Sequence, residues 1–117
     1  MTPAVQRGEI WTVAGGPDYA GKPRPAVIVQ DDAFAATGSV TICLLTSDPT
    51  DAPLLRLPLP ANADTGLALP SRIMIDKLTT VARTRLGARI GRLASDDMVR
   101  LNQALMVFLG LAGGVRR

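Results

Sequence analysis

Short apolar runs separated by proline and glycine fill the first two thirds of this 117-residue chain. The runs at residues 10–13, 25–30, 40–46 and 54–58 are rich in β-branched or large apolar residues, and turn-forming residues bound each of them. Runs of four to eight such residues are typical of β-strands. No internal repeat and no linker-like block interrupts the pattern. The sequence therefore predicts one domain, residues 1–117, built around short strands.

Further strands are expected at residues 71–76, 79–82 and 88–93, which gives about six strands in a mostly antiparallel sheet. The continuous apolar run at 25–30 fits a central strand that is buried on both faces. In 54–58 the alternation points Arg56 outward, and Pro58 favours an edge position because proline cannot donate to a strand ladder.

The last part of the chain changes to a helical period. Apolar residues recur at steps of three and four, at Met98, Leu101, Leu105, Phe108, Leu109 and Ala112. Ser95 is expected as the N-cap, Asp96 and Asp97 complement the helix dipole in the first turn, and Gly113 and Gly114 are expected to end the helix.

The apolar stripe of this helix is expected chiefly to pack on the sheet. Met106 and Leu111 widen the stripe enough to leave contact with a second copy open. Trp11 and Phe108 are both expected in the core.

Composition excludes several classes of protein. Hydrophobic residues make up 47% of the chain and charged residues 20%, which is typical of a globular domain. No apolar run approaches the roughly 20 residues of a membrane span, and the N-terminus does not resemble a secretion signal, so a cytoplasmic protein without a membrane partner is expected. Histidine is absent and Cys43 is the single cysteine, which excludes an intrachain disulfide, the usual zinc-ligand sets and histidine catalysis. Cys43 lies in an apolar strand and is expected to be inert.

The charges are mostly arginine and aspartate. The chain has eleven arginines and two lysines, and its net charge is +3. Between residues 68 and 93 six basic residues face the single acid Asp76. This stretch fits an anionic partner and fits a solvated surface equally well. The adjacent pairs at 31–32 and 96–97 are expected to serve as strand end and helix start, so no metal is assigned to them.

Two positions stand out as candidates for phosphate chemistry. Arg24 lies between Pro23 and Pro25, which restrict its backbone to extended conformations and suit it to hold a phosphate. A surface ion pair is the other interpretation of Arg24. Thr46 and Ser47 put two hydroxyls at a strand end, where turn formation is their ordinary role.

Five segments in order resemble the MazF/PemK family of toxins from type II toxin–antitoxin systems. They are RGEIW at 7–11, KPRPAVIVQ at 22–30, LTS at 45–47, IDKLTTV at 75–81 and IGRL at 90–93. The resemblance implies a mostly β fold with a C-terminal α-helix, an SH3-like β-barrel of the MazF/PemK/CcdB type, assembled as a homodimer.

The resemblance also implies an endoribonuclease that needs no metal and no cofactor. Such toxins cut single-stranded RNA, chiefly messenger RNA, at short motifs and leave 2′,3′-cyclic phosphate and 5′-hydroxyl ends. A cognate antitoxin blocks them by covering the RNA groove.

The family's catalytic arginine and threonine correspond to Arg24 and Thr46, and Asp76 matches an assisting acid. Tyr19 stands where several members carry an acid, so the general base is left open, with Asp76 as a candidate. The resemblance and the charge pattern suggest five RNA-binding residues: Tyr19, Lys22, Ser47, Arg72 and Lys77.

Two alternatives use the same fold without cutting RNA. CcdB-like toxins poison DNA gyrase through a tryptophan-glycine-isoleucine ending, which the Gly-Val-Arg-Arg ending at 114–117 does not match. A catalytically silent module that binds RNA or antitoxin is kept open by Tyr19. The cleavage motif is expected to depend on the loops at 17–22 and 48–53.

Overall fold

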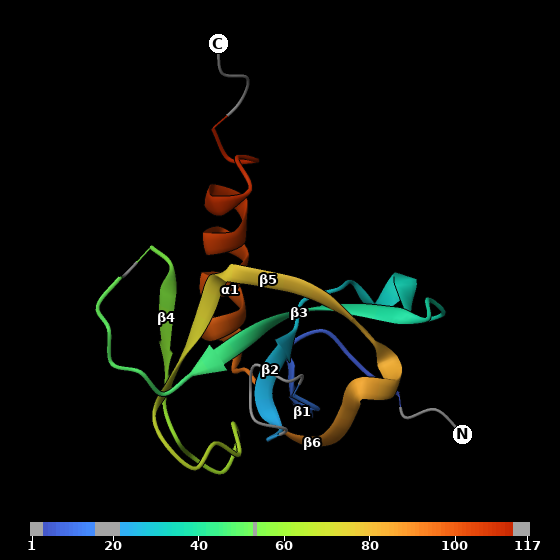
Figure 1. Cartoon of the computed structure of the whole chain (residues 1–117). Coiled ribbons are helices and arrows are strands. Elements are labelled where there is room, and N and C mark those ends of the chain that lie inside the picture. Colours follow the sequence, from blue (N-terminus) through green and yellow to red (C-terminus); the bar gives the residue numbers. More distant parts are fainter. Residues whose placement is uncertain (1–3, 16–21, 53, 114–117) are drawn as a thin grey trace.

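The computed structural model describes residues 4–15, 22–52 and 54–113 (Figure 1). In this part of the chain the elements follow in the order β1 (Glu9–Val13), β2 (Arg24–Ile28), η2 (Asp32–Phe34), β3 (Ser39–Thr46), β4 (Arg56–Leu59), β5 (Ser71–Ala82), η3 (Arg83–Arg85), β6 (Leu86–Arg92) and α1 (Ser95–Phe108).

The strands form one antiparallel sheet in the order β4-β5-β3-β2-β1-β6. The mostly β fold with a C-terminal helix is thereby confirmed. The sheet coils as a barrel does, but among the described residues no pairing joins its edge strands β4 and β6, so the barrel is open there. Pro58 lies on the edge strand β4, as its missing N–H predicted.

Strands β2 and β3 lie at the centre because their side chains are apolar on both faces. Ala26, Val27 and Ile28 are all buried, which confirms the prediction of a central strand.

Alternate residues of the central strands pack into two separate cores. Ile10, Val27 and Cys43 pack under α1 with Leu101 and Leu105. The other core lies on the opposite face of the strands and contains Trp11, Val13, Ala26, Ile28, Val40, Ile42 and Val81.

Strand β5 is one strand of twelve residues, where the sequence predicted two. Its register against β3 contains a bulge: Cys43 faces Leu78 and Leu45 faces Ile73, so the single residue Leu44 lies opposite the four residues 74–77. Extra residues bend a strand and increase its twist. The polar residues at 76–77 therefore mark a bulge rather than a strand end, and β5 bends sharply in Figure 1.

Both predicted ends of α1 were wrong. Ala94 occupies the N-cap position without a side-chain hydrogen bond, and Ser95 is the first helical residue. At the other end Gly110 has a φ of 76°, the Leu111 N–H donates to the Met106 carbonyl at 2.8 Å, and the Gly110 N–H donates to Val107 at 3.1 Å. These bonds form a Schellman motif, so the first available glycine ends the helix. Gly113 comes after this end, and Gly114 lies outside the described residues.

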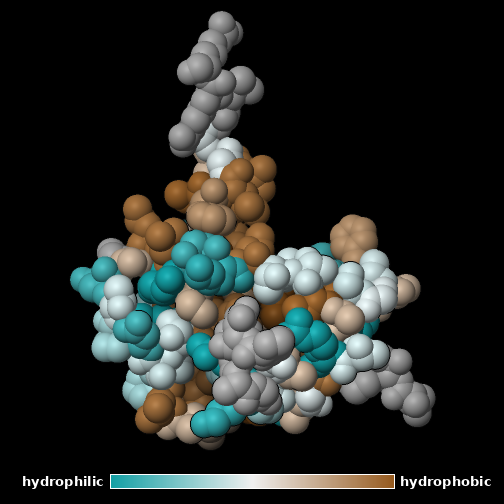
Figure 2. Space-filling view, in the orientation of Figure 1, coloured by the Kyte–Doolittle hydropathy of each residue, from teal (hydrophilic) through white to brown (hydrophobic). Residues whose placement is uncertain are grey.

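The second half of α1 extends beyond the sheet (Figure 1). Leu101 and Leu105 are buried, whereas Phe108 and Leu109 are 44% and 50% exposed. The prediction that the stripe packs on the sheet is therefore correct only for the first turns, and the prediction of Phe108 in the core was wrong. Trp11 is buried as predicted. We call the exposed residues the apolar helix end, which Figure 2 shows as one gathered surface: Met106, Val107, Phe108, Leu109 and Leu111.

In the described part of the chain no helix has both the length and the apolar character that a membrane crossing requires.

Candidate functional site

Three of the predicted site residues, Arg24, Thr46 and Arg72, lie at the same end of three neighbouring strands. We call these three residues the row. The β2–β3 pairing begins with Ala26 opposite Leu44, and Arg24 and Thr46 each lie two residues beyond that pair, at the same end of the two strands. Thr46 in turn pairs with Arg72 on β5. Directly opposed residues of antiparallel strands point to the same face. Since neighbouring strands lie about 4.8 Å apart, the row spans about 10 Å from the backbone of Arg24 to that of Arg72.

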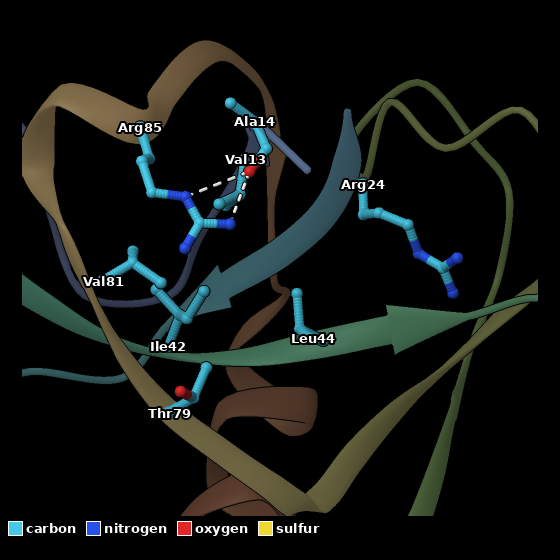
Figure 3. Close-up of a pocket in the computed structure, with 8 residues that line it drawn as sticks. All are labelled: Val13, Ala14, Arg24, Ile42, Leu44, Thr79, Val81 and Arg85. Atoms are coloured by element: carbon cyan, nitrogen blue, oxygen red, sulfur yellow. Dashed lines mark hydrogen bonds between the residues drawn. The ribbon is translucent and has the colours of Figure 1, made fainter. Parts of the chain in front are cut away.

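Arg24 begins β2, where it pairs with Val13 of β1 and is half-buried. The proline that follows it, Pro25, favours the extended backbone that the strand needs. Figure 3 shows the Arg24 side chain extending towards the arrowhead end of β3, which is the end that carries Thr46. Two independent strands therefore bring the arginine and the threonine to the same place on the sheet.

Thr46 is held by the turn that follows it. The Thr46 hydroxyl accepts a hydrogen bond from the Asp48 N–H at 3.1 Å. The Asp48 carboxylate accepts from the Thr50 N–H at 3.0 Å and from the Thr50 hydroxyl at 2.7 Å, and these bonds lower the pKa of Asp48. A hydroxyl that accepts one bond can still donate its own proton. The Thr46 hydroxyl is thus positioned by the 48–50 turn and keeps a donor for a ligand.

Arg72 ties the same turn to β5. Its guanidinium donates to the Thr50 carbonyl at 3.2 Å. The residue was predicted to bind RNA, and the structure gives it this second, structural contact. Because the partner is a neutral carbonyl, the positive charge of Arg72 remains uncompensated by this bond.

Asp76 is paired with Arg56, a residue that the sequence analysis had pointed outward. The Arg56 guanidinium donates to the Asp76 carboxylate and, at 3.1 Å, to the Leu55 carbonyl. The two side chains are only 18% and 26% exposed. Arg56 lies opposite Met74, on the face of β5 that carries Asp76 and away from the buried Ile73 and Ile75, so its side chain points away from that core as predicted and is withdrawn from solvent by the ion pair. A single basic residue within an otherwise apolar strand was the available signal for this pair.

Asp76 shares a face with the row but lies further along β5. Alternation puts Arg72, Met74 and Asp76 on one face and the buried Ile73 and Ile75 on the other. Four residues of strand correspond to about 13 Å. The structure therefore brings Arg24, Thr46 and Arg72 together and sets Asp76 at the side of the row.

The other four residues that were predicted to bind RNA are exposed or lie outside the described residues. Lys22, Ser47 and Lys77 are exposed, with Ser47 directly after the row and Lys77 in the bulge beside Asp76. Tyr19 lies outside the described residues.

The basic stretch at 68–93 is partly structural. Several arginines donate to backbone carbonyls: Arg83 to Thr37, and Arg85 to Ala14 through Nε at 3.1 Å and Nη2 at 2.6 Å. Arg7, outside the stretch, holds the Val29 carbonyl in the same way at 2.8 Å. We call Arg7, Arg72, Arg83 and Arg85 the carbonyl-anchored arginines. They act both as structural ties and as surface charge, so neither interpretation of the stretch is sufficient alone.

Arg89 has a different partner, the buried carboxylate of Glu9 at 3.2 Å. The same carboxylate accepts from the Trp11 indole N–H at 3.1 Å and from the Gln6 N–H at 2.8 Å. This cluster satisfies a charge that would be costly to bury alone, and it fixes the start of β1.

Two pockets lie at the ends of the row. The first has a volume of about 110 Å³ and is lined by Val13, Ala14, Arg24, Ile42, Leu44, Thr79, Val81 and Arg85 (Figure 3). The second, of about 410 Å³, is lined by Ser47, Pro49, Pro58, Leu59, Leu69, Pro70, Ser71 and Arg72. Arg24 belongs to the first pocket and Arg72 to the second. The row therefore connects two hollows, an arrangement that suits an extended ligand.

The cysteine and the acid pair at 31–32 have structural roles. Cys43 is fully buried, and burial raises the pKa of its thiol to about 12, so the thiol stays protonated. Asp31 accepts from the Ala33 N–H at 2.9 Å, and Asp32 accepts from the Arg7 N–H at 2.7 Å. Among the described residues no group of three or more histidines, cysteines or acids lies close enough together to hold a metal ion.

The row supplies what anion chemistry requires. A guanidinium forks onto phosphate oxygens, and a hydroxyl beside it can donate to the same group. Donors that are fixed before the reaction stabilise charge that develops in a transition state. The site can therefore bind a phosphodiester and stabilise it as negative charge builds on its oxygens.

Comparison with known proteins agrees with this chemistry. The chain is 54% identical to a probable endoribonuclease MazF of Mycolicibacterium smegmatis over 93% of its own length and all of that protein. It is 31% identical to the endoribonuclease MazF9 of Mycobacterium tuberculosis, with 92% of this chain and 98% of that one covered. A solved structure of an endoribonuclease in complex with its cognate antitoxin, from a mycobacterial species, matches with a TM-score of 0.76 and 25% identity over 92% of this chain and 97% of that one.

A family model described as a PemK-like, MazF-like toxin of type II toxin–antitoxin systems matches residues 6–109. This span contains the whole sheet, the row and all of α1. The chain therefore belongs to the PemK/MazF-like toxin family of type II toxin–antitoxin systems.

Proposed function

We propose that this chain is the toxin of a toxin–antitoxin pair and acts as an endoribonuclease on single-stranded RNA in the cytoplasm, through Arg24 and Thr46. The observation that carries the proposal is the row: Arg24 at the start of β2 lies at the same end of the sheet as the Thr46–Arg72 pair of β3 and β5. The close relatives named endoribonuclease MazF support the activity.

The proposed reaction is attack of a ribose 2′-hydroxyl on the adjacent phosphorus. The 2′-oxygen–phosphorus bond forms, the bond from phosphorus to the 5′-oxygen breaks, the 2′-proton passes to a base, and the leaving 5′-oxygen gains a proton. The products are a 2′,3′-cyclic phosphate and a 5′-hydroxyl. This step uses no water and no metal, and the 2′-hydroxyl requirement restricts it to RNA.

In this reaction Arg24 stabilises the charge on the non-bridging phosphate oxygens. Thr46 donates to the phosphate or aligns the 2′-hydroxyl, because the 48–50 turn fixes its oxygen. Asp76 is the candidate base, and its ion pair with Arg56 holds it at a constant position.

The proposed path of the RNA follows the row from one pocket to the other. Its phosphates meet Arg24 and Arg72, with Lys22, Ser47 and Lys77 as exposed contacts beside them. Tyr19 completes the predicted set as a stacking side chain.

The proposed assembly is a homodimer whose two copies meet through the apolar helix end. Large contiguous apolar surfaces on small proteins mark interaction sites, and this one comprises five neighbouring residues. The proposed inhibitor is a cognate antitoxin that covers the row, in line with the antitoxin complex of the solved relative.

The test is incubation of the purified protein with a long, weakly structured RNA in the presence of a chelator, with mapping of the cut ends and their chemistry. Arg24→Ala and Thr46→Val should each reduce cleavage by about 100-fold or more, the range for loss of one preorganised oxyanion donor. Arg100→Ala is the matched control, since Arg100 only pairs with Asp97 on the helix surface.

Discrete cuts in chelator, with cyclic-phosphate ends and dependence on Arg24, would support the proposal. Equal cleavage by the Arg24 variant would overturn the assignment of the site. Binding of RNA by the folded protein without cleavage would instead identify the silent binding module, and inhibition of gyrase without RNA cleavage the CcdB-like toxin.

A further inference from the structure

The pocket beside Arg24 has features that the cleavage step does not use. Arg24 lines it, so a ligand in the pocket is a neighbour of whatever phosphate Arg24 holds. On the proposed function, that phosphate is the one cleaved. From the position of the pocket beside Arg24 and from its lining we infer that the pocket receives the base of the nucleotide next to the cut. We also infer that Arg85 selects a keto base, uracil or guanine, over cytosine or adenine.

The floor of the pocket suits the flat face of a base. Val13, Ile42 and Val81 are almost fully buried members of one core and form a rigid layer beneath the pocket, while the more exposed Leu44 and Ala14 supply its accessible apolar surface. Bases that are splayed out of a single strand stack on apolar, aromatic or guanidinium surfaces. The volume of about 110 Å³ exceeds what one water needs. An apolar floor with the guanidinium group of Arg85 at its rim fits a base better than it fits a lone anion.

Arg85 is fixed at the rim before any ligand arrives. Its Nε and Nη2 both donate to the Ala14 carbonyl, and the Arg85 carbonyl accepts from the Ala14 N–H at 2.8 Å. Figure 3 shows the other terminal nitrogen of Arg85 directed towards Val81 and Ile42. Because the side chain is already ordered, little entropy is lost when a ligand meets it.

The chemistry of Arg85 gives the selectivity. A guanidinium has five N–H donors and no acceptor. The O4 of uracil and the O6 of guanine accept from such a donor, whereas cytosine and adenine carry an amino group at the same position. If an amino group faced Arg85, its N–H donors would lie opposite those of the guanidinium and neither would have an acceptor. Leaving buried donors without an acceptor costs binding free energy. Thr79, on the opposite wall, can donate or accept and so adds affinity without discrimination.

The first experiment maps cuts in a randomised RNA library for the wild type, Arg85→Gln and Arg83→Gln. The wild type should prefer uracil or guanine at one position next to the cut by about 10-fold or more, as expected for one good hydrogen-bonded contact. Glutamine can accept as well as donate, so Arg85→Gln should abolish this preference while Arg24-dependent cleavage continues.

Arg83→Gln is the matched control because Arg83 lies in the same turn, η3, and also donates to a carbonyl, but does not line the pocket. It should keep the wild-type preference. The inference is overturned by a wild type without keto preference beside the cut, or by an Arg85→Gln profile equal to that of the wild type.

A second experiment does not depend on cleavage or on the Arg85 variant folding. The methyl NMR signals of Val13, Ile42 and Val81 are followed while uridine 5′-monophosphate, cytidine 5′-monophosphate or ribose 5-phosphate is added to the wild type and to Thr79→Val. Uridine monophosphate should shift these signals more strongly than the other two, and Thr79→Val should weaken its binding.

Thr80→Val is the control for this experiment, since the Thr80 hydroxyl bonds Thr41 at 2.8 Å and Thr80 does not line the pocket. Equal responses to the two nucleotides, or no response, would overturn the inference. A selective response from a protein that cuts no RNA would support the base pocket and reject the proposed nuclease, so the two failures can be told apart.

Discussion

The guanidinium of Arg56 is bonded to the carboxylate of Asp76 across the β4–β5 pair, and both side chains are largely withdrawn from solvent. The candidate acid of the site is therefore a structural partner as well. A substitution of Asp76 changes stability and activity together unless the two effects are separated.

A double-mutant cycle measures the structural part. Asp76→Ala should lower the free energy of unfolding by about 1–3 kcal/mol, because it leaves the Arg56 guanidinium without its carboxylate. The loss in Arg56→Ala/Asp76→Ala should be smaller than the sum of the two single losses. Urea denaturation of the four proteins provides the numbers, and additivity to within about 0.5 kcal/mol would show that the pair contributes nothing.

Asp76→Asn isolates the catalytic part. The amide can still accept from Arg56, so the fold should be retained, while the base is lost. If Asp76 takes the 2′-proton, cleavage should fall by about 100-fold or more, the usual contribution of a positioned base. A rate near that of the wild type, with thermal unfolding unchanged, would leave Asp76 a positioning residue only.

The 48–50 turn should open in acid. Hydrogen bonds from the Thr50 hydroxyl and backbone hold the pKa of Asp48 below the ordinary 3.8. The stabilisation is therefore complete above about pH 4 and is lost as the pH falls through the lowered value. The amide NMR signal of Thr50 should titrate with a midpoint below 3.8, and Asp48→Asn should remove that titration. A midpoint at or above 3.8 would contradict the hydrogen bonds described here.

Cys43 should make the protein less stable in alkali. The folded thiol has a pKa of about 12 because it is buried, against an ordinary 9.0. Above about pH 9 the unfolded thiol loses its proton while the folded one keeps it, so the free energy of unfolding falls as the pH rises towards 12. Cys43→Ala should lack this component when urea denaturation is compared at pH 8 and pH 10. Rapid alkylation of the native wild type at pH 8 would show that the thiol is not buried.

The apolar helix end should control oligomeric state. If two copies meet there, Phe108→Ser should shift a dimer towards monomer by weakening an apolar contact within the apolar helix end. Sedimentation equilibrium over a range of concentrations measures this shift. Leu54→Ser is the control, because Leu54 is more exposed than Phe108 and precedes β4, outside that patch. An unchanged dimer in Phe108→Ser would place the interface elsewhere.

The strands of the central sheet were predictable because local sequence decides them. The β-branched runs that became β2 and β3 satisfy strand propensity and burial at once, and the alternation of neighbours such as Val27 and Ala26 feeds the two cores. Arg24 and Thr46 were identified as candidates from proline restriction, strand ends and the family resemblance, and both lie two residues beyond the Ala26–Leu44 pair, at the same end of β2 and β3.

The errors arose where distant contacts decide the outcome. Arg56 points away from the core as its alternation predicted, but its low exposure depends on the carboxylate of Asp76 in another strand. Trp11 and Phe108 are both large aromatic residues. Their burial differs because α1 extends beyond the edge of the sheet on which it packs, so no described strand lies beneath Phe108. At the helix end, Gly110 takes the left-handed conformation before the predicted pair of glycines is reached.

The carbonyl-anchored arginines affect how the protein binds a polyanion. A carboxylate partner would cancel their charge, whereas a neutral carbonyl restrains the side chain and leaves the charge in place. Arg7, Arg72, Arg83 and Arg85 therefore carry positive charge on side chains whose rotamer freedom was already lost on folding. Nucleic acid that docks on them can release its counterions to the solvent without first having to order the protein.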